Sequence, residues 1–291
     1  MPTSQTARYS VTPFPRERWL MVDGGRIGRQ KHLIHGLVEF DVTEPRAILR
    51  EHKRQTGEAV SFTAFVAHCL GQAVGEHKQL HAYRNWRSQL ILFDDVDVNT
   101  IFAVKSADGG EKILPHVLRA TNQRSVRDLH EEIRAFQAGR RTGGEADTLG
   151  WFIRLPGPIR RALYWACLRN PPIFKSAMGT VSLTAIGMFG NGGGWGLPVP
   201  AHSLQITLGG IAEKPGVVDH HIEIREYLSV TISLDHDVVD GAPAARFTQC
   251  FKTLVEQGAG LAEVVCATRV PAPMDSAEKE TSRGLQIQTH P

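Results

Sequence analysis

The sequence predicts an α/β protein in which a mixed β-sheet packs against helices to form a two-layer sandwich. Two kinds of periodicity indicate this class. Residues 204–208 and 229–234 alternate apolar and polar side chains, as strands with one buried face do. Other segments repeat apolar residues three and four positions apart, which is typical of helices that bury one face. A chain of 291 residues is long enough to bury a full core.

Four helices are expected from their start and stop residues. The free N–H groups at a helix start are satisfied by a serine or threonine side chain or by a serine–aspartate capping box. Proline is accepted in the first turn of a helix, and glycine is common just after its end. The expected helices run from Thr43 (with Pro45 in the first turn) to about Thr56 before Gly57, from Ser61, from Ser125 with Asp128, and from Pro243 to Gly258.

Six strands are expected, at 36–41, 91–104, 180–186, 204–211, 221–226 and 227–234. Together with the helices they predict one folded domain over residues 13–270. A polar stretch at 1–12 is expected to be a flexible N-terminal arm. Residues 271–291, rich in Pro, Ser, Glu and Thr, are expected to form a disordered tail.

Composition disfavours several classes of protein. A net charge of +3 is too small to indicate nucleic-acid binding, and no uninterrupted apolar run reaches the length of a membrane span. The N-terminus lacks a charged region followed by an apolar stretch, so we expect a cytoplasmic protein. The four cysteines, Cys69, Cys167, Cys250 and Cys266, contain no CxxC pair, so we expect free thiols and no metal site.

The distribution of charge is uneven. Residues 148–212 contain no Asp or Glu but five cations: Arg154, Arg160, Arg161, Arg169 and Lys175. Such a region can create a positive field for an anionic ligand, of which coenzyme A is one example. An interface or core segment in which all charges are sparse is an equally good interpretation.

A histidine follows the last alternating strand. Residues 227–235 end directly at His236, which is followed by Asp240, Gly241 and Pro243. Imidazole is the only side chain whose ordinary pKa lies between pH 5 and 8, so it suits proton transfer at a strand end. On spacing alone, an ordinary surface turn is the commoner origin of such a pattern.

Two motifs in the last third of the chain are more informative together. Residues 233–242 read Ser-Leu-Asp-His-Asp-Val-Val-Asp-Gly-Ala, and residues 179–190 read Gly-Thr-Val-Ser-Leu-Thr-Ala-Ile-Gly-Met-Phe-Gly. In sequence and order they resemble the catalytic domain of the 2-oxo acid dehydrogenase acyltransferases, the dihydrolipoamide acyltransferases, which are relatives of chloramphenicol acetyltransferase. A looser resemblance covers residues 36–103. The resemblance implies a chloramphenicol acetyltransferase-like fold and an acyltransferase catalytic domain at 13–270.

The resemblance also implies roles for three residues in moving an acyl group between coenzyme A and a thiol, hydroxyl or amine acceptor. His236 would be the general base, and the Thr184 hydroxyl would stabilise the oxyanion. Asp240 would form an ion pair that holds the loop behind the histidine, with Arg16 or Arg18 as its partner. Coenzyme A would be a co-substrate, held by residues that the motifs do not identify.

The chain departs from the family pattern in several places. Asp237 stands after the histidine where the family has a basic or small residue, and its charge would favour the imidazolium form. Ala185 replaces an asparagine, and residues 147–176 are longer and more basic than in the family. The glycine-rich stretch at 192–196 is expected to be a flexible turn.

Relatives assemble as trimers with the active site between subunits, so a homotrimer or a multiple of trimers is expected. No lipoyl domain precedes the catalytic part, so we expect a free-standing domain with no covalently bound lipoyl group. A catalytically weak scaffold protein of the same fold is the main alternative. Association of residues 152–169 with a membrane surface ranks last, because Pro156 and Pro158 disfavour a helix there.

Overall fold

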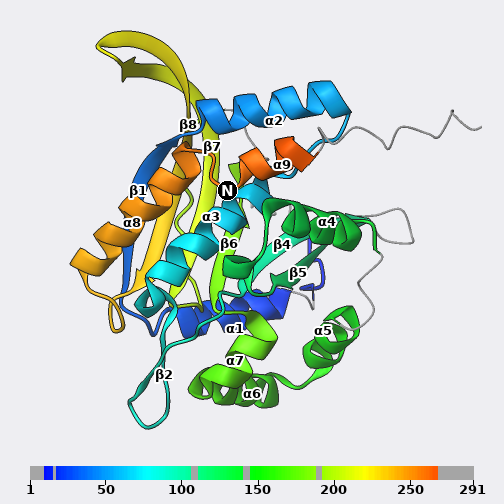
Figure 1. Cartoon of the computed structure of the whole chain (residues 1–291). Coiled ribbons are helices and arrows are strands. Elements are labelled where there is room, and N and C mark those ends of the chain that lie inside the picture. The colour runs from blue at the N-terminus through cyan, green and yellow to red at the C-terminus, as the bar shows by residue number, and fades with distance from the viewer. Residues whose placement is uncertain (1–9, 16–17, 106–110, 140–144, 188–191, 268–291) are drawn as a thin grey trace, which may run out of the picture.

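The computed structural model describes residues 10–15, 18–105, 111–139, 145–187 and 192–267. Six strands form one mixed sheet in the order β1-β8-β7-β6-β4-β5, and helices pack against it (Figure 1). The predicted α/β class and two-layer arrangement are confirmed. The segments expected to be a disordered tail and most of the flexible arm lie outside the described residues.

The strands and helices have the following bounds, given in chain order within each type. The sheet consists of β1 (Leu33–Asp41), β4 (Val98–Lys105), β5 (Glu111–Leu118), β6 (Val181–Ala185), β7 (Leu204–Val218) and β8 (His221–Asp235). The α-helices are α1 (Arg18–Gly28), α2 (Thr43–Thr56), α3 (Phe62–Glu76), α4 (Val126–Gln137), α5 (Glu145–Arg154), α6 (Gly157–Arg169), α7 (Pro171–Met178), α8 (Gly241–Glu256) and α9 (Leu261–Ala267). Strands β2 (Tyr83–Arg84) and β3 (Leu90–Ile91) form a separate hairpin, and η1 (Lys78–His81) and η2 (Thr121–Gln123) are 3-10 turns.

One face of the sheet carries the apolar core. Leu183, Ile206 and Ile232 are fully buried there in one cluster with the apolar faces of α3, α4 and α8. Phe40 of β1 packs edge-on against Phe251 of α8, with ring centroids 5.2 Å apart. Burial of a side chain of this size stabilises the fold by about 1.5–3 kcal/mol. These contacts therefore hold α8 firmly against the sheet.

The opposite face of the sheet is polar. Successive side chains of a strand point to opposite faces, so Thr184, Thr207 and Thr231 face away from the core. The strand register places them side by side on β6, β7 and β8. Thr207 and Thr231 are buried, yet their hydroxyl oxygens have no hydrogen-bond partner within the described ranges. The polar face thus contains hydroxyl groups that internal packing leaves unsatisfied.

Residues 192–196, which precede β7, lie across this polar face. Gly194 forms an antiparallel bridge with Gly210, and its N–H donates to the Ser229 Oγ at 3.1 Å. A Cβ on Gly209 would lie 1.9 Å from the Gly194 carbonyl oxygen, so only glycine permits the approach. The expected flexible turn at 192–196 is therefore wrong, because these residues pack on the sheet.

The helix starts expected at Ser61 and Ser125 are confirmed in detail, whereas Thr43 is the first residue of α2 and does not cap it, because the N-cap is Val42. Ser61 accepts the Ala64 N–H at 3.3 Å, and Ser125 and Asp128 form the predicted capping box. Gly57 ends α2 in the left-handed conformation, at φ 76°. The last predicted helix is α8, which begins two residues before Pro243.

Several strands differ from the expectation. The two strands predicted at 221–226 and 227–234 are one continuous strand, β8, and β7 extends to Val218 to pair with it. The resulting hairpin projects beyond the body of the molecule (Figure 1). The strand predicted at 91–104 is divided into β3 and β4. Strand β5, which was not expected, contains Pro115, a residue that a strand at the sheet edge accommodates.

Helices α1, α5, α6, α7 and α9 were also not expected. Helix α6 begins at Gly157, with Pro156 as its N-cap and Pro158 in its first turn. Proline is favoured at these positions, since the first N–H groups of a helix lack intrahelical partners. The two prolines therefore start the helix rather than interrupt it. Within the described residues, every helix is too short or too polar to cross a bilayer.

Candidate active site

His236 lies directly after the last residue of β8, at the end of the sheet. Its backbone N–H donates to the His32 carbonyl at 2.8 Å, and the N–H of Asp235 donates to the Ser203 carbonyl at 2.9 Å. The side chain of His236 is exposed. A strand end thus holds the backbone in place while the imidazole remains accessible to a reactant.

A buried ion pair supports the loop that follows. The Lys31 Nζ lies 2.5 Å from the Asp235 Oδ2, and both side chains are largely buried. The other Asp235 carboxylate oxygen accepts the N–H of Asp237 at 3.2 Å. The Asp235 carbonyl accepts the N–H groups of Val238 and Val239 at 3.0 and 3.1 Å. Asp235 therefore fixes the turn on which His236 sits, a role that the sequence did not reveal.

Asp240 has a different environment from the one expected. It is exposed at the N-cap of α8, without a side-chain capping bond. Among the described residues no cation forms an ion pair with it, Arg18 included, and Arg16 lies outside them. Within one protomer the brace of the histidine loop is the Lys31–Asp235 pair instead.

Asp237 contacts a different histidine from the one expected. The His32 Nδ1 lies 2.8 Å from the Asp237 Oδ1, in an exposed pair. The hydrogen bond to Asp237 raises the pKa of His32, and the same bond lowers the pKa of Asp237. The carboxylate that was expected to act on the His236 imidazole is thus directed to His32.

Thr184 and His236 do not meet in one protomer. Thr184 pairs with Thr207 of β7, and Thr207 pairs with Thr231 of β8. Thr231 lies five positions before His236 in the chain. At ordinary strand spacings this separation is roughly 16 Å along the strands and roughly 10 Å across them. The hydroxyl is half-buried on the polar face and makes no hydrogen bond that involves described residues. A single protomer therefore holds both groups far apart.

Two buried histidines near the site have structural roles. The His202 Nε2 lies 2.8 Å from the Met178 carbonyl, and the His81 Nδ1 lies 3.0 Å from the Thr180 Oγ1. Burial lowers the pKa of each to about 4, so both are neutral near pH 7. Among these three, only His236 combines exposure with a position at a strand end.

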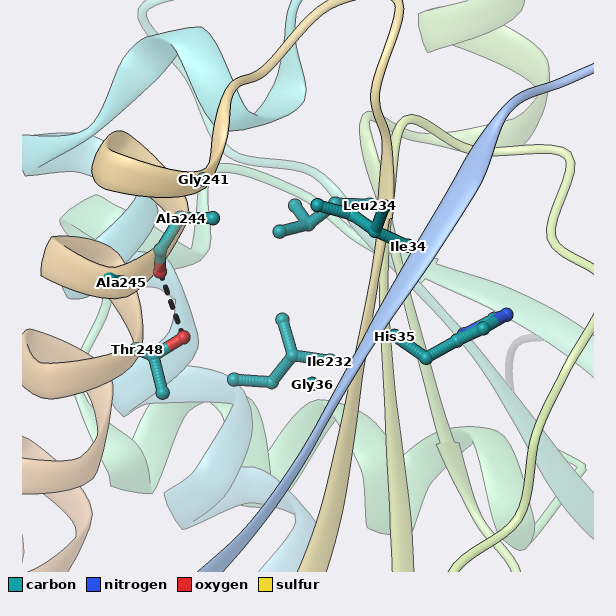
Figure 2. A pocket seen from close by; sticks show the side chains of 9 residues that line it. All are labelled: Ile34, His35, Gly36, Ile232, Leu234, Gly241, Ala244, Ala245 and Thr248. Atoms are coloured by element: carbon teal, nitrogen blue, oxygen red, sulfur yellow. Dashed lines mark hydrogen bonds between the residues drawn. The ribbon is translucent and has the colours of Figure 1, made fainter.

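A small apolar cleft lies between α8 and the strands β1 and β8. Figure 2 shows Ile34, Ile232 and Leu234 directed toward α8, whereas the His35 imidazole points away from the cleft. The His35 Nδ1 lies 2.8 Å from the Ser233 Oγ on the polar face. This cleft offers no ionisable side chain for catalysis, so the reactive groups belong to the polar face and the strand end.

One group of side chains could hold a metal ion, although no metal site was expected. The ligand atoms of Glu76, His77 and Cys250 all lie within 4.8 Å of one another. The Cys250 thiol donates to the Glu76 Oε2 at 3.4 Å, and burial raises the pKa of this thiol to about 11. A thiol–carboxylate hydrogen bond thus accounts for the contact. Cys69, Cys167 and Cys250 are all free.

The fold and the position of the histidine define a class of protein. Residues 175–262, which include Thr184, His236 and Asp240, match the family of 2-oxoacid dehydrogenases acyltransferase (catalytic domain). The match confirms the resemblance predicted from the two motifs and relates this part of the chain to those catalytic domains.

The particular relatives agree with this class. The chain is 37% identical over 83 residues to the dihydrolipoyllysine-residue acetyltransferase component of the pyruvate dehydrogenase complex of Zymomonas mobilis, an alignment that covers 28% of this chain and 19% of that protein. A longer alignment, 23% identical over 225 residues, covers 76% of the chain and 46% of the lipoamide acyltransferase component of the branched-chain alpha-keto acid dehydrogenase complex of Bacillus subtilis. The chain therefore spans less than half the length of these relatives.

Solved structures agree in fold. Azotobacter vinelandii dihydrolipoamide acetyltransferase superposes with a TM-score of 0.65 at 17% identity, covering 90% of this chain and 97% of that one. A probable dihydrolipoamide acetyltransferase from Listeria monocytogenes gives a TM-score of 0.62 at 19% identity, covering 86% and 95%. The chain thus has the fold of these catalytic domains.

Proposed function

We propose that this protein is an acyltransferase that moves an acyl group between coenzyme A and a thiol, hydroxyl or amine acceptor. In this reaction His236 removes the proton from the attacking acceptor, and the Thr184 hydroxyl donates to the oxyanion of the tetrahedral intermediate. General-base catalysis contributes typically about 10²- to 10⁴-fold to the rate. The exposed imidazole at the end of β8 has the access that this step requires.

A pattern of intervals carries the proposal. In Azotobacter vinelandii dihydrolipoamide acetyltransferase, a serine, a histidine and an asparagine have been investigated for their role in the catalytic mechanism. The histidine follows the serine by 52 residues, and the asparagine follows the histidine by 4 residues. Thr184, His236 and Asp240 follow one another at the same two intervals. Each residue that replaces another keeps a related function: threonine retains the hydroxyl, and aspartate retains a carbonyl-type acceptor.

The distance between the two groups supports a site that two protomers share. Since Thr184 and His236 lie far apart in one chain, the reaction requires the hydroxyl of one protomer and the imidazole of its neighbour. In a cyclic trimer, the surface of each protomer that carries Thr184 would face the surface of the next protomer that carries His236. The trimer would therefore contain three such sites. Largely exposed apolar side chains on the projecting hairpin, Val217, Ile222 and Ile224, are consistent with a covered surface in that assembly.

Coenzyme A is the acyl carrier in this proposal. Residues 148–212 contain cations but no carboxylate, so this region would attract the phosphate groups of coenzyme A. Two of the five cations there already form ion pairs, Arg160 with Asp23 and Lys175 with Asp95. Arg154, Arg161 and Arg169 therefore remain as candidates for phosphate contacts or for another anionic surface.

Release of coenzyme A from a panel of acyl-CoAs, with dihydrolipoamide or a simple thiol as acceptor, tests the proposal. We expect the wild-type protein to release coenzyme A and His236→Ala to lose at least about 10²-fold in kcat, while its circular dichroism stays unchanged. Lys53→Ala, at an exposed position of α2, is the control and should keep full activity. Full activity of His236→Ala would contradict the mechanism, and inactivity of the wild type with every acyl-CoA would favour a scaffold protein.

A further inference from the structure

Helix α6 exposes apolar side chains on its outward side, and two polar side chains are among those that it directs inward. The inward side holds Arg160, whose Nε lies 2.5 Å from the Asp23 Oδ2 of α1 in a buried ion pair. Tyr164 is on the same side, in contact with α1 near Gly24. Polar groups therefore link the helix to α1, while much of its apolar surface stays exposed.

The exposed residues of this helix are here called the α6 outer face. They comprise six apolar residues and two arginines: Pro158, Ile159, Ala162, Leu163, Trp165, Ala166, Arg161 and Arg169. The side chains of Ile159, Leu163 and Trp165 are 49%, 42% and 54% exposed, respectively. A large apolar surface of this kind on a soluble domain marks an interaction site.

The two charged residues on this face are both positive. The Arg169 guanidinium lies 4.8 Å from the centroid of the Trp165 ring, and neither Arg161 nor Arg169 forms an ion pair with any described residue. The sequence from 148 to 212 supplies no carboxylate to neutralise them. An apolar strip with tryptophan and unpaired arginines matches the boundary of an anionic bilayer, where the rings enter the headgroup region and the guanidinium groups meet phosphate.

We infer that the α6 outer face binds the surface of an anionic lipid bilayer, with the helix lying in the plane of the membrane. The 13-residue helix is about 20 Å long at 1.5 Å per residue, so it suits a helix that lies on a membrane and is too short to cross one. The prolines that argued against this site in the sequence stand at the helix start and leave the face intact. This inference does not depend on acyl transfer.

Binding to vesicles tests the inference on the full chain without an activity assay. Vesicles of phosphatidylcholine alone are compared with vesicles that contain phosphatidylglycerol, and bound protein is measured by flotation. We expect binding to the anionic vesicles, weaker binding to the neutral ones, and weaker binding at high salt because the arginines are screened.

Two variants identify the surface. Ile159→Ser combined with Trp165→Ser should weaken binding to anionic vesicles at least about 10-fold, since both apolar anchors are lost. Arg161→Gln combined with Arg169→Gln should weaken it and reduce its salt dependence. Trp86→Ser is the matched control, because Trp86 is also exposed and also has an arginine, Arg87, 4.5 Å from its ring centroid. This control should bind as the wild type does.

Three results would overturn the inference. The first is the absence of wild-type binding to anionic vesicles, and the second is unchanged binding of the Ile159→Ser, Trp165→Ser protein. The third is a change in the oligomeric mass of that variant by light scattering, which would show that a second copy of the chain covers the face. All substituted side chains are exposed, and thermal melts confirm that the variants fold.

Discussion

The two halves of the proposed site, the His236 loop and the Thr184 strand end, are built in different ways. The loop after β8 is complete within one protomer, because Lys31, Asp235 and the His32 carbonyl hold it. Thr184 lies on the polar face beside buried hydroxyls that have no partner in the described part of the chain. One half is internally satisfied, whereas the hydroxyls beside the other are not, a difference that fits the proposed site shared between protomers.

The largest expected effect sharpens the role of the unsatisfied half. Thr184→Val should lower kcat about 10²- to 10³-fold, as the loss of one oxyanion donor does, with little change in thermal stability. Thr184→Ser keeps the hydroxyl and should retain most of the activity. Steady-state coenzyme A release measures both variants, and equal activity of the valine and serine variants would remove Thr184 from the mechanism.

A change in the braced half should act through stability. Asp235→Asn leaves the buried Lys31 without its partner and should lower the free energy of unfolding by about 3–5 kcal/mol. Adding Lys31→Met removes the unpaired charge and should restore part of that loss. Urea unfolding at one fixed protein concentration measures both, since association into the proposed trimer would also contribute to stability. Equal stability of wild type and Asp235→Asn would show that the pair does not brace the loop.

Asp240→Asn should have a smaller effect on the same measurement. Because the Asp240 carboxylate is exposed and unpaired within the described protomer, its replacement should change the free energy of unfolding by less than about 0.5 kcal/mol. A loss as large as that of Asp235→Asn would indicate that Asp240 has a buried partner in the assembled protein.

The smallest expected effect concerns the pair in front of the loop. The pKa of His32 is raised in the folded protein, so its contribution to folding stability is complete below pH 6.5. That contribution is lost as the pH rises through the pKa of His32 in the folded state. The pKa of Asp237 is lowered in the folded protein, so its contribution to folding stability is complete above pH 3.8. That contribution is lost as the pH falls through the pKa of Asp237 in the folded state. The pair is therefore strongest between these pH values. In an NMR titration, Asp237→Asn should lower the pKa of His32; an unmoved His32 would contradict the contact.

Much of the fold could be predicted from local patterns. Capping residues marked α3 and α4, and alternation marked β7 and β8, because these elements bury one regular face. Helix α6 was not predicted because Pro156 and Pro158 disfavour a helix when only the sequence is considered, whereas in the structure both stand at its start. Its inward contact, Arg160 with Asp23, joins residues 137 positions apart and leaves no local signal.

The reactive residues of the site could be predicted, but not their supports. The motifs located Thr184 and His236, whereas the Lys31–Asp235 pair joins residues 204 positions apart and has no local signature. The contact of Asp237 with His32 is equally non-local, at 205 positions. Pairing across the sheet, which only the folded chain establishes, decided which carboxylate braces the histidine.

Complementation between two inactive variants tests the shared site most directly. His236→Ala retains Thr184, and Thr184→Val retains His236, so a mixed trimer contains some sites with both groups intact. Random co-assembly of equal amounts should restore about one quarter of the wild-type coenzyme A release, since each site takes one group from each of two neighbours. Activity no higher than that of the separate variants, in trimers shown by mass to be mixed, would contradict a site shared between protomers.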